Sequence, residues 1–345
     1  MFAVRTLSLA RRKFFCVPSV KPRDIRFLST ENHSPKGLSA VKKYVFSSYV
    51  EFIKSYENKL EKKFPTAIRV YKIFKVGFQD FYQDLKMFIK IKRKLTFNDI
   101  SCLTRKELEL NHQMPIDMMK VAPVLLISAL PLANYVAFPI AYFFPRHLLS
   151  RQFWTLQQRA RFAVLEQKIK LASYKPVFRF LQAKMHLIKG HPTKPVWKQC
   201  IAQLGSGLHP NSEKIHESQI LFCNGEVYDI DCLSPRHIRS LLKMHNMHLG
   251  LRRRKRLIER ARLIVYLDKA IINEGGVNSL PYEDVRKACF FRGLNPTNMN
   301  SEDTVIWLNE WIQLTTRMKD ENWSYVLHLP ILMAYNHPSN WVLIH

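Results

Sequence analysis

The stretch "LSPRHIRSLLKMHNM", residues 233–247, carries the signals of a helix that starts sharply and buries one face. The Ser234 side chain can accept a hydrogen bond from a backbone amide of the first turn, and Pro235 has the backbone angle that suits the first helical position. Leu241 and Leu242 then follow on the apolar side. The stretch therefore predicts an amphipathic helix.

Helix signals continue on both sides of this stretch. We predict helices over residues 252–273, 282–292 and 301–318, and a polar helical region over 151–189. No run of alternating apolar and polar residues predicts a strand. The sequence thus predicts an all-α fold, with one helical domain over residues 151–345.

A long apolar segment rich in proline precedes this domain. It reads "KVAPVLLISALPLANYVAFPIAYFFP" over residues 120–145, with no charged side chain between Val121 and Phe144. As a helix it could cross a hydrocarbon core of about 30 Å, where neighbouring helices, hydroxyl groups or water satisfy the carbonyls that proline leaves free. We predict one kinked transmembrane segment over residues 118–148. Its characteristic residues are Pro123, Pro131, Asn134, Pro139 and Pro145.

The N-terminal residues have the composition of a mitochondrial transit peptide. Residues 1–30 contain many Arg and Lys, a single acid (Asp24), and interspersed apolar and hydroxyl side chains. Lys and Arg are also more frequent after the apolar segment than before it, which favours a matrix location for the C-terminal part. These features predict a single-pass protein of the mitochondrial inner membrane with its C-terminus in the matrix.

Residues 41–110 are predicted to form an amphipathic helical region, with aromatic side chains at helical spacing and lysines between them. Two interpretations remain open. The region can lie on a membrane surface with its lysines at acidic head groups, or it can pack against other helices of the same protein.

The composition favours an anionic partner and argues against several classes of enzyme. The chain of 345 residues has 54 Lys and Arg against 27 Asp and Glu, a net charge of +27. It has no G-x-G-x-x-G or G-x-x-x-x-G-K-[ST] motif, no C-x-x-C pair and no convincing set of nucleophile, base and oxyanion donors. His245 and His248 lack the neighbouring ligands that a zinc site needs. We therefore predict a protein that is not an enzyme and has no cofactor and no metal site.

The run "LRRRKRLIERARL", residues 251–263, is a concentrated basic feature of the helical domain. Its side chains can neutralise phosphates of ribosomal RNA, or of cardiolipin at the matrix leaflet. A solvated helix face and a nuclear import signal are the alternative interpretations. The candidate polyanion-binding residues are Arg252, Arg253, Arg254, Lys255, Arg256 and Arg260.

Two further blocks resemble the LETM-domain family of mitochondrial inner-membrane proteins. "LTRKELELNHQMPIDMMKVAP", residues 103–123, resembles the part that leads into that family's membrane segment, and it begins with an L-T-R-x-E pattern. "LDKAIINEGGVNSLPYEDVRKACFFRGL", residues 267–294, resembles the family's helical module. The signature residues of the module are Asp268, Gly275, Glu283, Cys289, Arg292, Gly293 and Trp311.

The resemblance implies a short member of the family, with a matrix-facing helical module similar to a ribosome-binding domain. The chain has no D-x-[DN]-x-[DN]-G loop, so calcium binding through an EF-hand is not expected. Asn134 stands where larger members carry a glutamate, and the loss of an ionisable group favours a membrane anchor over an ion path. We expect Cys289 and Trp311 in the core, and Asp268 and Glu274 facing a partner or capping a helix.

We therefore expect a non-enzymatic inner-membrane protein that supports mitochondrial structure and function, with a module that binds the mitochondrial ribosome or another matrix protein. Anionic inner-membrane lipid such as cardiolipin is the second expected partner, and no small-molecule substrate is expected. Two alternative functions stay open. One is a component of a cation/proton exchange system of the inner membrane, and the other is a regulatory protein with a nuclear pool that binds transcription factors.

Overall fold

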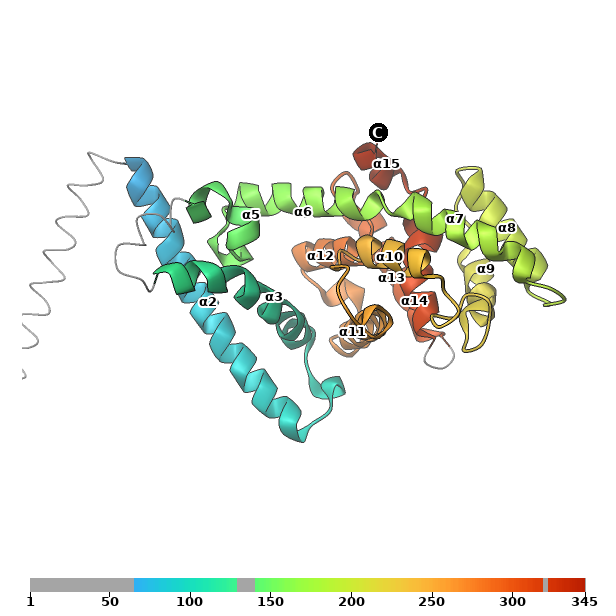
Figure 1. Cartoon of the computed structure of the whole chain (residues 1–345), viewed down its shortest axis with the longest axis horizontal. Coiled ribbons are helices and arrows are strands. Elements are labelled where there is room, and N and C mark those ends of the chain that lie inside the picture. The colour runs from blue at the N-terminus through green and yellow to red at the C-terminus, as the bar shows by residue number, and fades with distance from the viewer. Residues whose placement is uncertain (1–64, 129–139, 319–321, 345) are drawn as a thin grey trace, which may run out of the picture. The chain divides into compact units, whose positions relative to one another are not determined.

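The computed structural model describes residues 65–128, 140–318 and 322–344, and every regular element in these ranges is a helix (Figure 1). The prediction of an all-α fold is confirmed for the described residues. Arg69–His345 forms one compact unit, which holds all of these helices apart from the first residues of the first one. The predicted transit peptide and residues 41–64 of the predicted amphipathic region lie outside the described residues.

Most of the first helices of the unit share a small apolar cluster. The helices that share it are α2 (Pro65–Phe97), α3 (Arg105–Ser128), α5 (Pro145–Leu148) and η2 (Arg151–Phe153), and the short η1 (Ile100–Cys102) lies between α2 and α3 in the chain. Phe81 of α2, Met114 of α3 and Phe153 of η2 are all buried in this cluster. A Cβ on Gly77 would lie 2.6 Å from Cδ1 of Phe153, so glycine lets α2 approach η2 closely. One face of α2 thus packs against other helices of the protein, as one of the two interpretations expected.

The predicted transmembrane segment is only partly described. Pro123 lies inside α3 and Pro145 is the first residue of α5, whereas Pro131, Asn134 and Pro139 are outside the described residues. Val121 and Val124 of α3 are buried in the cluster around Phe153. Among the described helices, none combines the length and the apolar character that a membrane crossing requires.

The remaining helices form the module. They are α6 (Leu156–Leu171), α7 (Tyr174–Lys184), η3 (Met185–Leu187), α8 (Lys194–Gly205), α9 (Ser212–Glu217), η4 (Ser218–Phe222), α10 (Pro235–Met244), α11 (Arg253–Asn273), η5 (Val277–Ser279), α12 (Tyr282–Arg292), α13 (Ser301–Thr316), α14 (Trp323–Ala334) and α15 (Pro338–Ile344). The predicted bounds of α11, α12 and α13 agree with these to within two residues. α10 begins as predicted, because Ser234 Oγ accepts a hydrogen bond from the His237 amide at 3.3 Å.

α14 forms the centre of the module, where it packs against α11, α7 and η4 (Figure 1). All of its residues from Ser324 to Ala334 are buried. α11 supplies a continuous apolar face to the same core, including Leu257, Ile264 and Ile271. The module therefore has one main hydrophobic core, to which both α11 and α14 contribute.

Two buried histidines join α10 to α14. Nε2 of His237 and Nε2 of His328 are 3.0 Å apart, and Nδ1 of His328 lies 2.6 Å from the Ser324 carbonyl oxygen. Because a carbonyl oxygen can only accept, His328 carries its proton on Nδ1, and His237 Nε2–H donates to His328 Nε2. Both rings are neutral. Burial lowers the pKa of His328 to about 4 and that of His237 well below its usual value.

We expect the folded state to lose stability as the pH falls from 7 to 5. His328 has its ordinary pKa of 6.5 when unfolded, so between pH 6.5 and 4 the unfolded chain binds more protons than the folded chain. This histidine alone contributes a loss of about 2 kcal/mol between pH 7 and pH 5. Urea denaturation of the full chain at the two pH values, followed by circular dichroism, measures the loss. His328→Gln should lose less over the same interval, and a wild-type midpoint that is the same at both pH values would contradict the prediction.

Candidate functional site

The predicted polyanion-binding residues lie at the N-terminus of α11. Arg252 precedes the first helical residue in a left-handed conformation, with φ at 53°. The first turn has no acidic residue, and no side chain caps it. Since a helix N-terminus carries a partial positive charge, cations there cost stability, whereas phosphate groups bind favourably to the same free amides.

Two arginines of the run hold neighbouring loops in place. Arg254 donates from Nε to the carbonyl oxygen of Ile230 at 3.1 Å and from Nη2 to that of Leu233 at 2.9 Å. Arg253 Nε donates to the Leu249 carbonyl oxygen at 3.0 Å. In contrast, Arg252 and Lys255 are exposed, and neither side chain makes a hydrogen bond or an ion pair with any other described residue. Arg252 and Lys255 are therefore the cations of the run most available to a partner.

Arg256 and Arg260 lie further along α11 and are less exposed. Nη1 of Arg256 is buried without a hydrogen-bond partner among the described residues. The Arg260 guanidinium lies 4.8 Å from the centre of the Phe291 ring, and its Nη2 donates to the His245 carbonyl oxygen at 3.3 Å. Burial lowers the pKa of Arg260 to about 10. The structure thus gives Arg260 a packing role inside the module and separates it from the exposed end of the run.

The signature residues Asp268, Arg292 and Trp311 meet in one buried cluster. Asp268 Oδ1 accepts from Nε of Arg292 at 3.0 Å and also from its Nη2. Oδ2 of the same carboxylate accepts from Trp311 Nε1 at 3.1 Å and from Thr315 Oγ1 at 2.9 Å. Asp268 is 1% exposed and Arg292 is 2% exposed. The expectation that Asp268 faces a partner or caps a helix was wrong, because this carboxylate is the buried counter-ion that joins α11, α12 and α13.

Of the other signature residues, two glycines follow the ends of α11 and α12, and Cys289 and Glu283 lie within α12. Gly275 follows α11 with φ at +102°, and Gly293 follows α12 with φ at +95°. Cys289 is fully buried, as expected, and burial raises the pKa of its thiol to about 12. Glu283 instead lies on the surface of α12, where it pairs with Arg286 at 3.3 Å.

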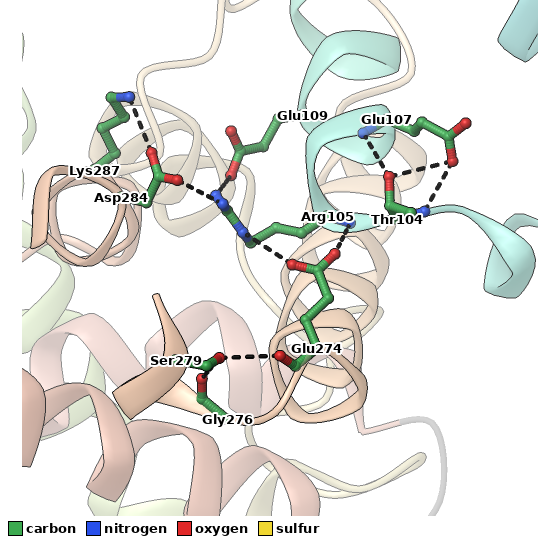
Figure 2. Close-up of polar contacts among 9 residues, drawn as sticks. All are labelled: Thr104, Arg105, Glu107, Glu109, Glu274, Gly276, Ser279, Asp284 and Lys287. Carbon is green, nitrogen blue, oxygen red and sulfur yellow. Dashed lines mark hydrogen bonds and ion pairs between the residues drawn. The ribbon is translucent and has the colours of Figure 1, made fainter. Parts of the chain in front are cut away.

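The L-T-R-x-E pattern forms a junction between α3 and the module (Figure 2). The Arg105 side chain is 3% exposed and lies among three carboxylates. Its Nη1 is 2.8 Å from Glu109, its Nη2 is 2.7 Å from Asp284 of α12, and its Nε is 3.6 Å from Glu274 at the end of α11. The Arg105 backbone amide also donates to Glu274 at 2.8 Å. One buried arginine thus joins the start of α3 to two helices of the module.

The same pattern caps α3. The backbone amide of Thr104 donates to the Glu107 carboxylate at 2.9 Å, and the Glu107 amide lies 3.3 Å from Thr104 Oγ1 (Figure 2). This is a reciprocal capping box, which a threonine followed three residues later by glutamate signals in sequence. The partners of Arg105 carried no comparable signal, because Glu274 and Asp284 lie 169 and 179 residues away.

The described residues contain no group of three or more His, Cys, Asp or Glu side chains that could hold a metal ion. His245 is buried, and its Nε2 lies 3.0 Å from the Leu327 carbonyl oxygen. What the module offers is a basic surface at the start of α11 and a set of buried polar connections that hold its helices together.

Comparison with known proteins gives concordant results. A family model described as "LETM1-like, RBD" matches residues 103–332. A protein of Xenopus tropicalis named LETM1 domain-containing protein 1 is 32% identical over 287 residues, which cover 82% of this chain and 81% of the relative. Proteins of the same name from Homo sapiens and Bos taurus are each 28% identical over 310 residues, with 88% of this chain and 86% of each relative covered.

Proposed function

Because this chain belongs to the LETM1-like RBD family, we propose that it is a non-enzymatic protein of the mitochondrial inner membrane whose helical module binds the mitochondrial ribosome or another matrix partner. RBD in the family description denotes a ribosome-binding domain. In this proposal the module faces the matrix and supports mitochondrial structure and function.

The start of α11 is the observation that carries the ribosome-binding proposal. It presents Arg252 and Lys255 without internal partners among the described residues, next to uncapped backbone amides. The helix dipole disfavours cations at this end by about 0.3–1 kcal/mol each, so local helix stability does not explain their presence. Neutralising the phosphates of an RNA backbone does explain it.

Exposed apolar side chains support the membrane part of the proposal. Met119 and Leu126 of α3 are 79% and 73% exposed, and Phe143 is 73% exposed. On α2, Phe78 and Tyr82 are exposed among lysines that include Lys86 and Lys90, which suits contact with anionic lipid. We propose that the single-pass anchor lies within residues 118–148 and that α2 contacts cardiolipin.

Neutralising the exposed basic side chains should weaken ribosome binding. We expect the double variant Arg252→Gln, Lys255→Gln to bind mitochondrial ribosomes less tightly, with a weaker dependence on salt. If each side chain contacts one phosphate, the slope of log K against log salt should fall in magnitude by about 1–2. Co-sedimentation of the full chain with mitochondrial ribosomes at several salt concentrations measures both quantities. Arg253 and Arg254 are left unchanged, because their side chains hold neighbouring loops at Leu249 and at Ile230 and Leu233.

A matched control removes two exposed lysines elsewhere in the module. Lys168→Gln, Lys175→Gln loses the same charge from α6 and α7. It should keep nearly the wild-type affinity and salt slope if the start of α11 makes the contact. Equal weakening by the two double variants would show a general charge effect and would rule out a specific site at α11.

A further inference from the structure

A groove with a volume of about 520 Å³ lies along the outer face of α13. Its other walls come from the loop before α9 and α9 itself, the loop before α13, the end of α14 and the start of α15. Its volume is within the range of sites that hold small molecules or a few residues of a peptide. We call it the α13 groove, and none of the signature residues lines it.

One stripe of α13 forms the floor of the groove. Asp303, Ile306, Trp307 and Glu310 occur at intervals of three and four residues, which places them on the same helix face. Trp307 is 6% exposed, and its Nε1 donates to the Met333 carbonyl oxygen at 3.4 Å, whereas Ile306 is 56% exposed. The stripe therefore presents an apolar centre with a carboxylate at each end.

The α13 groove is acidic on a strongly basic protein. Its lining contains Asp303 and Glu310 and neither Lys nor Arg, although the chain has 54 Lys and Arg against 27 Asp and Glu. The rings of His209 and His337 lie 5.9 Å apart in its wall. Burial lowers the pKa of both, that of His337 to about 4, so neither adds positive charge at neutral pH.

Buried asparagines hold the walls of the groove in position. Asn336 Nδ2 donates to the carbonyl oxygens of Leu204 and Leu208, each at 2.9 Å. The Asn295 amide donates to Asn340 Oδ1 at 2.8 Å, and Asn295 Nδ2 donates to the Ser339 carbonyl oxygen at 2.8 Å. Because these bonds are satisfied within the chain, the groove is formed before any partner arrives.

We propose that the α13 groove docks a basic peptide segment of a partner protein, with an apolar anchor of that segment on Ile306 and Trp307. The Lys or Arg side chains of the segment pair with Asp303 and Glu310. These carboxylates are seven residues apart, or about 10 Å along the helix, so a helical partner would carry its basic residues seven positions apart. The inference goes beyond the proposed function, because the groove repels phosphate and selects a protein segment.

Binding of a designed probe tests the proposal. The probe is a fluorescent 14-residue helical peptide with Lys at two positions seven apart and Leu at the third and fourth positions after the first Lys. We expect the full chain to bind it, with no binding when Glu replaces each Lys and weaker binding when Ser replaces each Leu. Asp303→Lys, Glu310→Lys should weaken binding of the Lys peptide by at least about tenfold, since two attractions become repulsions. Both residues are exposed, so the fold should persist, with a small loss of helix stability from Asp303→Lys in the first turn of α13.

A matched control changes the net charge equally outside the groove. Glu259→Lys, Glu302→Lys replaces two exposed carboxylates on α11 and α13 that do not line it, and should bind the Lys peptide like the wild type. Ile306→Ser tests the apolar anchor without any change in charge. The proposal would be overturned by absence of binding, by equal affinity for the Glu peptide, or by equal weakening in the groove and control variants. A dimer in sedimentation that the groove variant dissociates would also overturn it, by assigning the groove to a second copy of this chain.

Discussion

Replacing Asp268 with asparagine is expected to destabilise the module by about 3–5 kcal/mol, because it leaves the Arg292 guanidinium buried without a counter-ion. Trp311 Nε1 and Thr315 Oγ1 donate to the second oxygen of the same carboxylate. An asparagine side chain has one oxygen and one NH2 group. Its NH2 group would therefore face either the Arg292 guanidinium or the Trp311 and Thr315 donors, and donor would meet donor. A loss of this size is a large part of the 5–15 kcal/mol that holds a typical domain together.

Urea denaturation of the full chain, followed by circular dichroism, measures this loss. The double variant Asp268→Leu, Arg292→Met removes both charges together and should be more stable than Asp268→Asn, because no buried charge is left unpaired. If the free energy of unfolding of Asp268→Asn is within about 1 kcal/mol of the wild-type value, the ion pair does not stabilise the module as we propose.

Replacing Gly293 with alanine should have a comparable effect for a steric reason. The backbone φ of +95° at Gly293 is unfavourable for a residue with a Cβ. An alanine Cβ would also lie 2.0 Å from Tyr174 Oη and 3.2 Å from Cβ of Pro330. Tyr174 is fully buried and donates to the Gly293 carbonyl oxygen at 2.7 Å, so it cannot move aside without losing that bond. We expect a loss of about 2–5 kcal/mol from backbone strain and overpacking together.

Two variants separate the backbone strain from the steric clash. Gly207 has φ at +87° with nothing within 4 Å of an added Cβ, so Gly207→Ala reports the strain alone and should cost less. Tyr174→Phe removes the hydroxyl that the new Cβ would meet, so part of the stability should return in the double variant with Gly293→Ala. Chemical denaturation of the wild type, Gly293→Ala, Tyr174→Phe and their double variant completes the cycle, and Gly207→Ala is measured in the same way. Equal losses for Gly293→Ala and Gly207→Ala would show that the contact with Tyr174 is unimportant.

The signature residues illustrate how far the sequence could reach at the candidate site. Their pattern identified the family, but it did not reveal that Asp268, Arg292 and Trp311 touch one another. Asp268 is separated from Arg292 by 24 positions and from Trp311 by 43, and no local spacing rule connects such residues. For this reason Asp268 was assigned to a helix cap or a partner, although it is a buried counter-ion.

The helices also differ in how well the sequence predicts them. Those with a polar face, such as α10 and α13, were predicted closely, because an apolar period marks them in the sequence and Ser234 marks the start of α10. The sequence also suggested Ser301 as the cap of α13, but the cap position is Asn300 and its side chain makes no cap hydrogen bond. α14 was not predicted. It is buried on every side, so it has no polar face to reveal its period, and Pro330 lies within it.

The sequence by itself determined the all-α class, the starts of several helices and the membership of a family, because these depend on local spacing and residue types. Only the tertiary structure decided which basic side chains of the α11 run are free, how Arg105 joins α3 to the module, and that a basic protein carries an acidic groove along α13. The physical reason is that exposure, ion pairing and charge complementarity depend on contacts between residues far apart in the chain. Folding brings those residues together, and no pattern along the sequence records it.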